Sequence, residues 1–145
     1  APPGMPGAFV LQYLLDPIAS TIATAAAVSH VALDADAGRW SIELHPTYLY
    51  PVAVQVRPGD HRRVDDPAER LAQAREGYVA TAGRIATELP TPTRMSSRQR
   101  LGMVEDMWRI ALAKVAGDPP PDRRSCCLIY SLPGCVPCAG CPRLR

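Results

Sequence analysis

Apolar residues recur at helical spacing in three stretches of the chain, the first of them near the N-terminus. Asp16 followed by Pro17 has the pattern of an N-cap with proline at the first helical position, so we predict a helix from there to about Ser29. Its apolar face is expected to contain Ile18, Ile22 and Ala25. Residues 1–8, rich in proline and glycine, are expected to form a flexible arm.

Two further helices are predicted between residues 66 and 117. Asp66-Pro67 begins one of them, which ends near Leu89 because prolines follow. Ser96 or Ser97 caps the other, which ends at Gly117. The expected apolar faces are Leu71, Tyr78, Ala82, Ile85 and Leu89 in one helix, and Leu101, Val104, Trp108, Ala111, Leu112 and Val115 in the other.

The chain between residues 31 and 56 has the shorter period of strands. Residues 40–44 alternate between apolar and polar, and residues 48–56 are rich in aromatic and β-branched side chains around Pro51. We predict a small antiparallel meander with Pro51 on an edge. The aromatic side chains of this region, Trp40, Tyr48 and Tyr50, are expected in the core. The predicted fold class is therefore α+β: about three helices, a small meander and an irregular C-terminal loop.

A chain of 145 residues is expected to form a single domain, residues 1–145. Within it we distinguish the arm, a helical and β-stranded body at residues 9–118, and a C-terminal segment at residues 119–145. Three consecutive prolines, Pro119 to Pro121, form a stiff spacer that would bring this last segment to the outside of the body.

Composition and charge remove several function classes. The formal net charge is only +2, which gives no reason to expect nucleic-acid binding. The first basic residue is Arg39, so we expect no charged region of a secretory signal, and polar residues interrupt the apolar stretch at residues 9–33. We expect a soluble cytoplasmic protein without a transmembrane segment, for which peripheral contact with a membrane is still compatible with the sequence.

The cysteines carry most of the chemical information. Cys126 and Cys127 are adjacent, ten residues follow, and Cys138 and Cys141 form a Cys-x-x-Cys pair, while the fifth cysteine, Cys135, lies between the pairs. An odd number of cysteines leaves one unpaired in a disulfide framework, and a chain of this length needs no disulfides to fold. Clustered thiols in a reducing cytoplasm bind metals.

Zinc and iron–sulfur chemistry both accept four thiolates. Adjacent side chains in an extended backbone point apart, which makes it hard for Cys126 and Cys127 to bind one tetrahedral zinc, whereas a two-iron cluster offers two metal atoms. A thioredoxin-like site is less consistent with the sequence, because Pro142 and the few residues after it leave no room for the helix that lowers the thiol pKa.

The residues around these cysteines resemble a known family. Arg124-Ser-Cys126-Cys127-Leu-Ile-Tyr130, then Pro133-Gly134, then Cys138-Ala-Gly-Cys141-Pro resembles the C-terminal signature of the FhuF-type ferric siderophore reductases, Cys-Cys-x10-Cys-x2-Cys. The resemblance covers about residues 123–143. It implies a [2Fe–2S] cluster bound by Cys126, Cys127, Cys138 and Cys141 that reduces siderophore-bound iron(III), and it leaves Cys135 without a role.

The loop between the cysteine pairs is predicted to fold back at Pro133-Gly134, a type II turn. Gly134 and Gly140 would let backbone N–H groups approach the sulfurs. The arginines beside the cysteines, Arg123, Arg124 and Arg143, are either solvated surface residues or offset the thiolate charge and attract an anionic chelate or an acidic electron donor. Tyr130 could stack on a siderophore, so the candidate substrate-binding residues are Arg123, Arg124, Tyr130 and Arg143. His30, His45 and His61 are scattered, and Glu105-Asp106 is interpreted as part of a solvent-exposed helix face.

No catalytic acid or base and no nicotinamide-binding motif is recognised. Electrons would therefore come from a separate donor, a ferredoxin or a flavin- or NAD(P)H-dependent reductase. Three function classes follow: a [2Fe–2S] ferric siderophore reductase, a [2Fe–2S] electron-transfer or redox-sensing protein with another acceptor, and a zinc-stabilised binding module.

Overall fold

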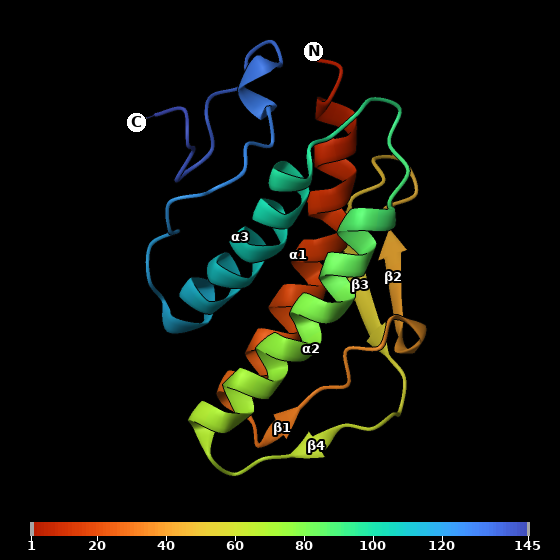
Figure 1. The fold of residues 1–145 in the computed structure, drawn as a ribbon, viewed down its shortest axis with the longest axis vertical. Helices are drawn as coiled ribbons and strands as arrows, with labels where there is room; N and C mark the ends of the chain where they lie inside the picture. The colour runs from red at the N-terminus through yellow and green to blue at the C-terminus, as the bar shows by residue number, and fades with distance from the viewer. Residues whose placement is uncertain (1, 145) are drawn as a thin grey trace.

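The computed structural model describes residues 2–144, which form three long helices and two small sheets (Figure 1). α1 spans Met5–Val28, α2 spans Pro67–Glu88 and α3 spans Ser97–Ala116, and each of these helices packs against the other two. The predicted α+β class, with three helices, small antiparallel sheets and an irregular C-terminal region, is confirmed.

The hydrophobic core lies where the three helices meet. Tyr78 of α2 and Trp108 of α3 are both buried and stack with ring centroids 5.3 Å apart. The Tyr78 hydroxyl donates a hydrogen bond of 2.9 Å to the carbonyl of Val104, so the one polar group of this ring is satisfied. Fully buried aliphatic and thioether side chains complete the core: Leu11, Leu15, Ile22, Met103 and Met107.

α1 begins much earlier than predicted, at Met5 rather than at Pro17. Four of its buried residues, Leu11, Leu15, Ile18 and Ile22, continue one face through the proline at spacings of four and three. An internal proline costs about 3 kcal/mol, and burying each large aliphatic side chain contributes about 1.5–3 kcal/mol, so core packing outweighs the break.

The early start of α1 also changes the predicted N-terminal arm. Residues 5–8 are helical, and Gly7 and Ala8 are buried. Among residues 2–144, α1 is the one helix whose length and composition would suit a membrane span. In the structure it is a core helix that packs against both α2 and α3.

The caps of α2 and α3 are confirmed. The Asp66 carboxylate accepts a hydrogen bond of 2.8 Å from Glu69 N, and the Ser96 hydroxyl accepts one of 3.1 Å from Gln99 N. α3 ends at Gly117 in the left-handed conformation, with φ of 74°. Two residues of the predicted apolar face of α3 do not join the core: Leu101 is 52% exposed, and Val115 is partly buried outside the core cluster.

The strands form two separate antiparallel pairs instead of one meander. β2 (Trp40–Leu44) pairs with β3 (Pro51–Val56) as a hairpin, while β1 (Val31–Ala32) pairs with β4 (Arg62–Arg63) beyond the hairpin. Pro51 begins β3 at the irregular end of the hairpin, where the backbone N–H that proline lacks is not needed. A 3-10 turn, η1 (Ala37–Arg39), precedes β2.

The hairpin tip differs from the prediction. Tyr48 is 73% exposed and Tyr50 is 42% exposed, so neither belongs to the core. Both rings pack on the imidazole of His45, each with a centroid distance of 5.0 Å. Trp40 is partly buried against the core, as expected, and its indole N–H donates to the carbonyl of Asp34.

After α3 the chain reverses and runs back along the outer side of that helix (Figure 1). We call residues 122–141 the cysteine segment. It contains a single 3-10 turn, η2 (Ile129–Ser131), and ends near the start of α1, so both termini lie at the same end of the molecule.

Candidate metal centre

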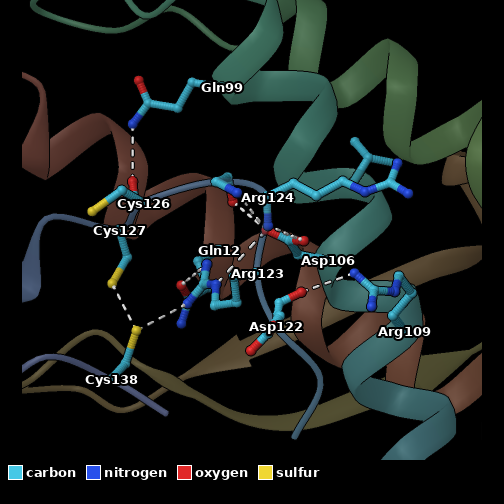
Figure 2. A network of polar contacts seen from close by, with 12 residues as sticks. Gln12, Gln99, Asp106, Arg109, Asp122, Arg123, Arg124, Cys126, Cys127 and Cys138 are labelled. Carbon is cyan, nitrogen blue, oxygen red and sulfur yellow. Dashed lines mark hydrogen bonds and ion pairs between the residues drawn. The ribbon is translucent and has the colours of Figure 1, made fainter. Parts of the chain in front are cut away.

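One stripe of α3 holds the start of the cysteine segment. Gln99, Gly102, Asp106 and Arg109 follow one another at helical spacing, so they lie on one face. Gln99 Nε2 donates to the carbonyl of Cys126 at 3.0 Å, and Arg109 Nη1 donates to the carbonyl of Asp122 at 2.9 Å (Figure 2). Gln99, near the start of α3, contacts Cys126, and Arg109, further along α3, contacts Asp122. The segment therefore runs antiparallel to the helix.

Asp106 is the centre of this stripe, and its side chain is fully buried. Its carboxylate accepts hydrogen bonds of 2.8 Å from the backbone N–H of Arg124 and from that of Ser125, and one of 2.6 Å from the Ser125 hydroxyl. Buried backbone N–H groups need acceptors, and a carboxylate that supplies several at once fixes the path of the chain. Asp106 thus places Cys126, which follows directly.

Two glycine turns fold the rest of the segment. Gly134 has φ of 76°, and Cys135 N donates to the carbonyl of Leu132, which confirms the predicted type II turn at Pro133-Gly134. Gly140 has φ of 68°, and Cys141 N donates to the carbonyl of Cys138 at 3.0 Å, so the Cys-x-x-Cys pair is itself a tight turn.

The turns bring two sulfurs from opposite pairs together. Cys127 Sγ lies 3.8 Å from Cys138 Sγ (Figure 2). Cys127 and Cys141 are buried, whereas Cys126 and Cys138 are partly exposed. Cys126 Sγ points in a different direction from its neighbour and accepts a contact of 3.4 Å from Leu128 N. Cys135 is exposed at the far end of the loop.

Arg123 is a buried cation beside these sulfurs. Its Nη1 lies 3.7 Å from Cys138 Sγ and its Nη2 donates to Gln12 Oε1 at 3.1 Å. Its Nε lies 3.8 Å from Asp106 Oδ2 and has no hydrogen-bond partner in the described part of the chain. We expected Arg123 to contact substrate; in the structure it is 5% exposed, and its guanidinium faces the thiols and α1.

The pKa of the Cys138 thiol is raised above its ordinary value. Burial is the main cause, and the neighbouring Cys127 adds to it, while the positive charge of Arg123 acts in the opposite direction. A metal binds the thiolate, so its binding releases the proton that this environment retains. Metal affinity would therefore fall as the pH falls.

The donor set fits thiolate-bound metal. Two thiolates on one tetrahedral metal at about 2.3 Å lie about 3.8 Å apart, which matches the Cys127–Cys138 pair. Among residues 2–144, no three His, Cys, Asp or Glu side chains already converge as a metal site, so Cys126 and Cys141 must turn toward this pair to complete it. Cys138 is also within electrostatic reach of Cys141.

The other expected substrate residues lie on the surface of the same region. Arg143 stacks on Tyr130, with its guanidinium carbon 4.7 Å from the ring centroid. Arg124 is exposed and extends along α3, on the other side of the segment from the sulfurs of Cys127 and Cys138 (Figure 2).

The three histidines have other contacts. His61 Nδ1 accepts from Asp34 N at 2.9 Å, and His45 Nδ1 accepts from Thr47 N at 3.2 Å. His30 pairs with Asp65 at 3.5 Å on the surface.

Sequence reasoning missed Asp106, Gln12 and Gln99. The Glu105-Asp106 pair was interpreted as a solvent-exposed face, yet Asp106 is buried and organises the segment. The sequence does contain a signal for Asp106. Polar and small residues recur at helical spacing on a face next to the apolar face: Gln99, Gly102, Asp106 and Arg109. Gln12 left no such signal, because only the fold brings α1 to Arg123.

Comparisons of this chain with protein-family models, with curated proteins and with solved structures find no match. The resemblance to the FhuF-type reductases therefore rests on the cysteine spacing and the residues around it. The function that it implies is a proposal.

Proposed function

We propose that this protein binds a [2Fe–2S] cluster through Cys126, Cys127, Cys138 and Cys141 and reduces siderophore-bound iron(III) by one electron. The observation that carries the proposal is the approach of Cys127 and Cys138 to 3.8 Å from opposite halves of the Cys-Cys-x10-Cys-x2-Cys spacing, beside a buried guanidinium. When bound, such a cluster supplies electrons one at a time.

The protein's own residues would hold and balance the site. Four thiolates carry four negative charges, and the guanidinium of Arg123 offsets part of that charge next to Cys138. Asp106 keeps Arg123 and the backbone before Cys126 in place. Hydrogen bonds to thiolate sulfur favour the reduced, more negative state and so raise a reduction potential.

The reaction requires no acid or base from the protein. One electron converts siderophore-bound iron(III) to iron(II), and siderophores hold iron(II) far less tightly, so the metal is released without the breaking of a covalent bond. The electron is proposed to come from a separate donor protein, a ferredoxin or a flavin- or NAD(P)H-dependent reductase. The location is proposed to be the reducing cytoplasm, where clustered thiols bind metals.

Stopped-flow mixing tests this function. Dithionite-reduced protein, freed of excess dithionite under anaerobic conditions, is mixed with a panel of ferric siderophores while visible absorbance and trapped iron(II) are followed. We expect reoxidation of the protein with release of one iron(II) per electron. If no chelate reoxidises the protein faster than it decays in buffer, the reductase proposal fails and an electron carrier or sensor takes its place.

A further inference from the structure

A groove of about 920 Å³ lies between α3 and the cysteine segment. Arg98, Leu101 and Arg109 of α3 line one side, and Arg124 and Pro142 line the other. The volume is within the range of about 300–1,000 Å³ that is usual for small-molecule sites. Arg123 also lines the groove, so two of the substrate residues expected from the sequence, Arg123 and Arg124, lie there.

The groove is predominantly positive. Four arginines line it against two acidic residues, Glu105 and Asp122. Glu105 is already paired with Arg75 at 2.8 Å, outside the groove. The guanidinium groups of Arg98 and Arg124 are exposed and have no hydrogen-bond or ion-pair partner among residues 2–144. Two unpaired guanidiniums that line one groove are suited to carboxylates, which they bind in a bidentate manner.

The groove also offers apolar and acceptor groups. Leu101, which was expected in the core, is 52% exposed and presents its side chain to the groove. The carboxylate of Glu105 can accept a hydrogen bond from a hydroxyl group in addition to its pair with Arg75, because a carboxylate has about four acceptor sites. The combination matches a ligand that carries carboxylates and hydroxyls on a short carbon frame, rather than the broad acidic face of a protein.

The groove is one residue away from the candidate metal centre. Pro142 lines it and directly follows Cys141, while Arg123 lines it and also contacts Cys138 Sγ at 3.7 Å. A ligand in the groove would therefore lie beside residues that adjoin or contact the sulfurs.

We propose that this groove binds the ferric chelate, that the chelate is of the hydroxycarboxylate class, and that Arg98 and Arg124 contact its carboxylates. This inference rests on the proposed function, since it names the substrate class of that reaction. Arg109, whose Nη1 is bound to the carbonyl of Asp122, positions the wall of the groove.

A redox-inert probe tests the groove separately from the reaction. Gallium(III) citrate has the charge and shape of a ferric hydroxycarboxylate chelate but accepts no electron from the protein. We expect isothermal titration at low salt to show binding to the intact protein that weakens as salt is added. In the double variant Arg98→Glu and Arg124→Glu, affinity should fall at least about 10-fold.

Arg84→Glu is the matched control, because Arg84 is an exposed arginine of α2 that does not line the groove. It should bind gallium citrate like the wild type, and circular dichroism should show that all variants remain folded. Equal affinity in the double variant and the wild type, or no binding by the wild type, overturns the groove proposal even if ferric siderophores reoxidise the protein. Specific binding without any reoxidation supports the groove and contradicts the reductase function instead.

Discussion

Arg123 lies between a buried carboxylate and a thiol, where its positive charge acts directly on Cys138. Its Nη1 contacts Cys138, its Nη2 contacts Gln12, and its Nε faces Asp106 at 3.8 Å. A cation held in this way costs desolvation energy that only its negative neighbours offset. With four thiolates nearby, its charge would favour the oxidation state that carries more negative charge.

The first prediction concerns the reduction potential. Arg123→Gln removes the positive charge and weakens the N–H donation to Cys138, so the midpoint potential of the bound cluster should fall by about 60 mV, the equivalent of one charge-assisted hydrogen bond for a one-electron couple. Redox titration followed by electron paramagnetic resonance measures it. Arg123→Lys, which keeps the charge, should recover most of the shift. An unchanged potential in Arg123→Gln would mean that Arg123 is only a packing element.

The second prediction compares two glycines with positive φ. A Cβ at Gly140 would overlap the carbonyl of Pro121, whereas a Cβ at Gly134 would meet nothing within 4 Å. Both alanine variants bear the left-handed strain of about 1–2 kcal/mol, but only Gly140→Ala must also displace the backbone. Hydrogen exchange at Arg123 N, which donates to the carbonyl of Gly140 at 2.8 Å, should accelerate in Gly140→Ala alone. Equal exchange in the two variants contradicts this.

At the scale of elements, α3 has two faces that contact other parts of the chain. One packs Val104, Trp108 and Ala111 into the core, and the other uses Gln99, Asp106 and Arg109 to hold the cysteine segment. The segment has almost no regular structure, so its shape depends on these hydrogen bonds. Loss of one buried hydrogen-bond partner on α3 should therefore make the segment more mobile and leave the packing of the core unchanged.

The third prediction follows from this dependence. Asp106→Asn removes the charge that faces buried Arg123 and weakens acceptance from Arg124 N and Ser125 N, which should cost about 3 kcal/mol. For a chain of this size the Tm should fall by roughly 10 °C. Limited proteolysis should cut first between residues 118 and 126. Glu105→Gln, the neighbouring substitution on the partly exposed side, should change the Tm by no more than about 2 °C.

How far the sequence predicts the fold depends on the element. The caps at Asp66, Ser96 and Gly117 are local chemistry, and the structure has them as predicted. The start of α1 was missed because an N-cap with a following proline at Asp16-Pro17 is also compatible with a helix interior when the apolar face continues on both sides. The β1–β4 pair was missed because its partners lie about thirty residues apart and each strand has only two residues.

The cysteine spacing and the turn of the candidate site were predictable from the sequence, but the residues that hold the site in place were not. The positions of the cysteines and the turn at Pro133-Gly134 could be predicted from local sequence. The burial of Arg123 and its contact with Gln12 depend on residues more than one hundred positions apart that only the tertiary fold brings together. The same holds for the groove, since Arg98 and Arg124 line one groove only because the segment runs back along α3.

At the scale of the whole molecule, the core and the candidate metal centre are separate. The core cluster consists of residues from Ala8 to Ala111 and includes none of the cysteines. The fourth prediction is that chelation of iron leaves the helical circular dichroism nearly unchanged, with disorder confined to residues after Pro121. Zinc-finger-like domains behave in the opposite way and unfold without metal. Collapse of the far-ultraviolet signal on iron removal would contradict the separation.

The most direct test of the account is the iron and acid-labile sulfide content of the protein reconstituted without oxygen, measured for the wild type and for each cysteine-to-serine variant. The account predicts about two irons and two sulfides per chain in the wild type and in Cys135→Ser, with visible absorbance and a paramagnetic signal after reduction. In the serine variants of Cys126, Cys127, Cys138 and Cys141 it predicts loss of the iron and the sulfide, because serine oxygen is a harder and poorer ligand. Colourless protein with one zinc per chain, or a cluster that depends on Cys135 and survives one of the other four substitutions, would contradict it.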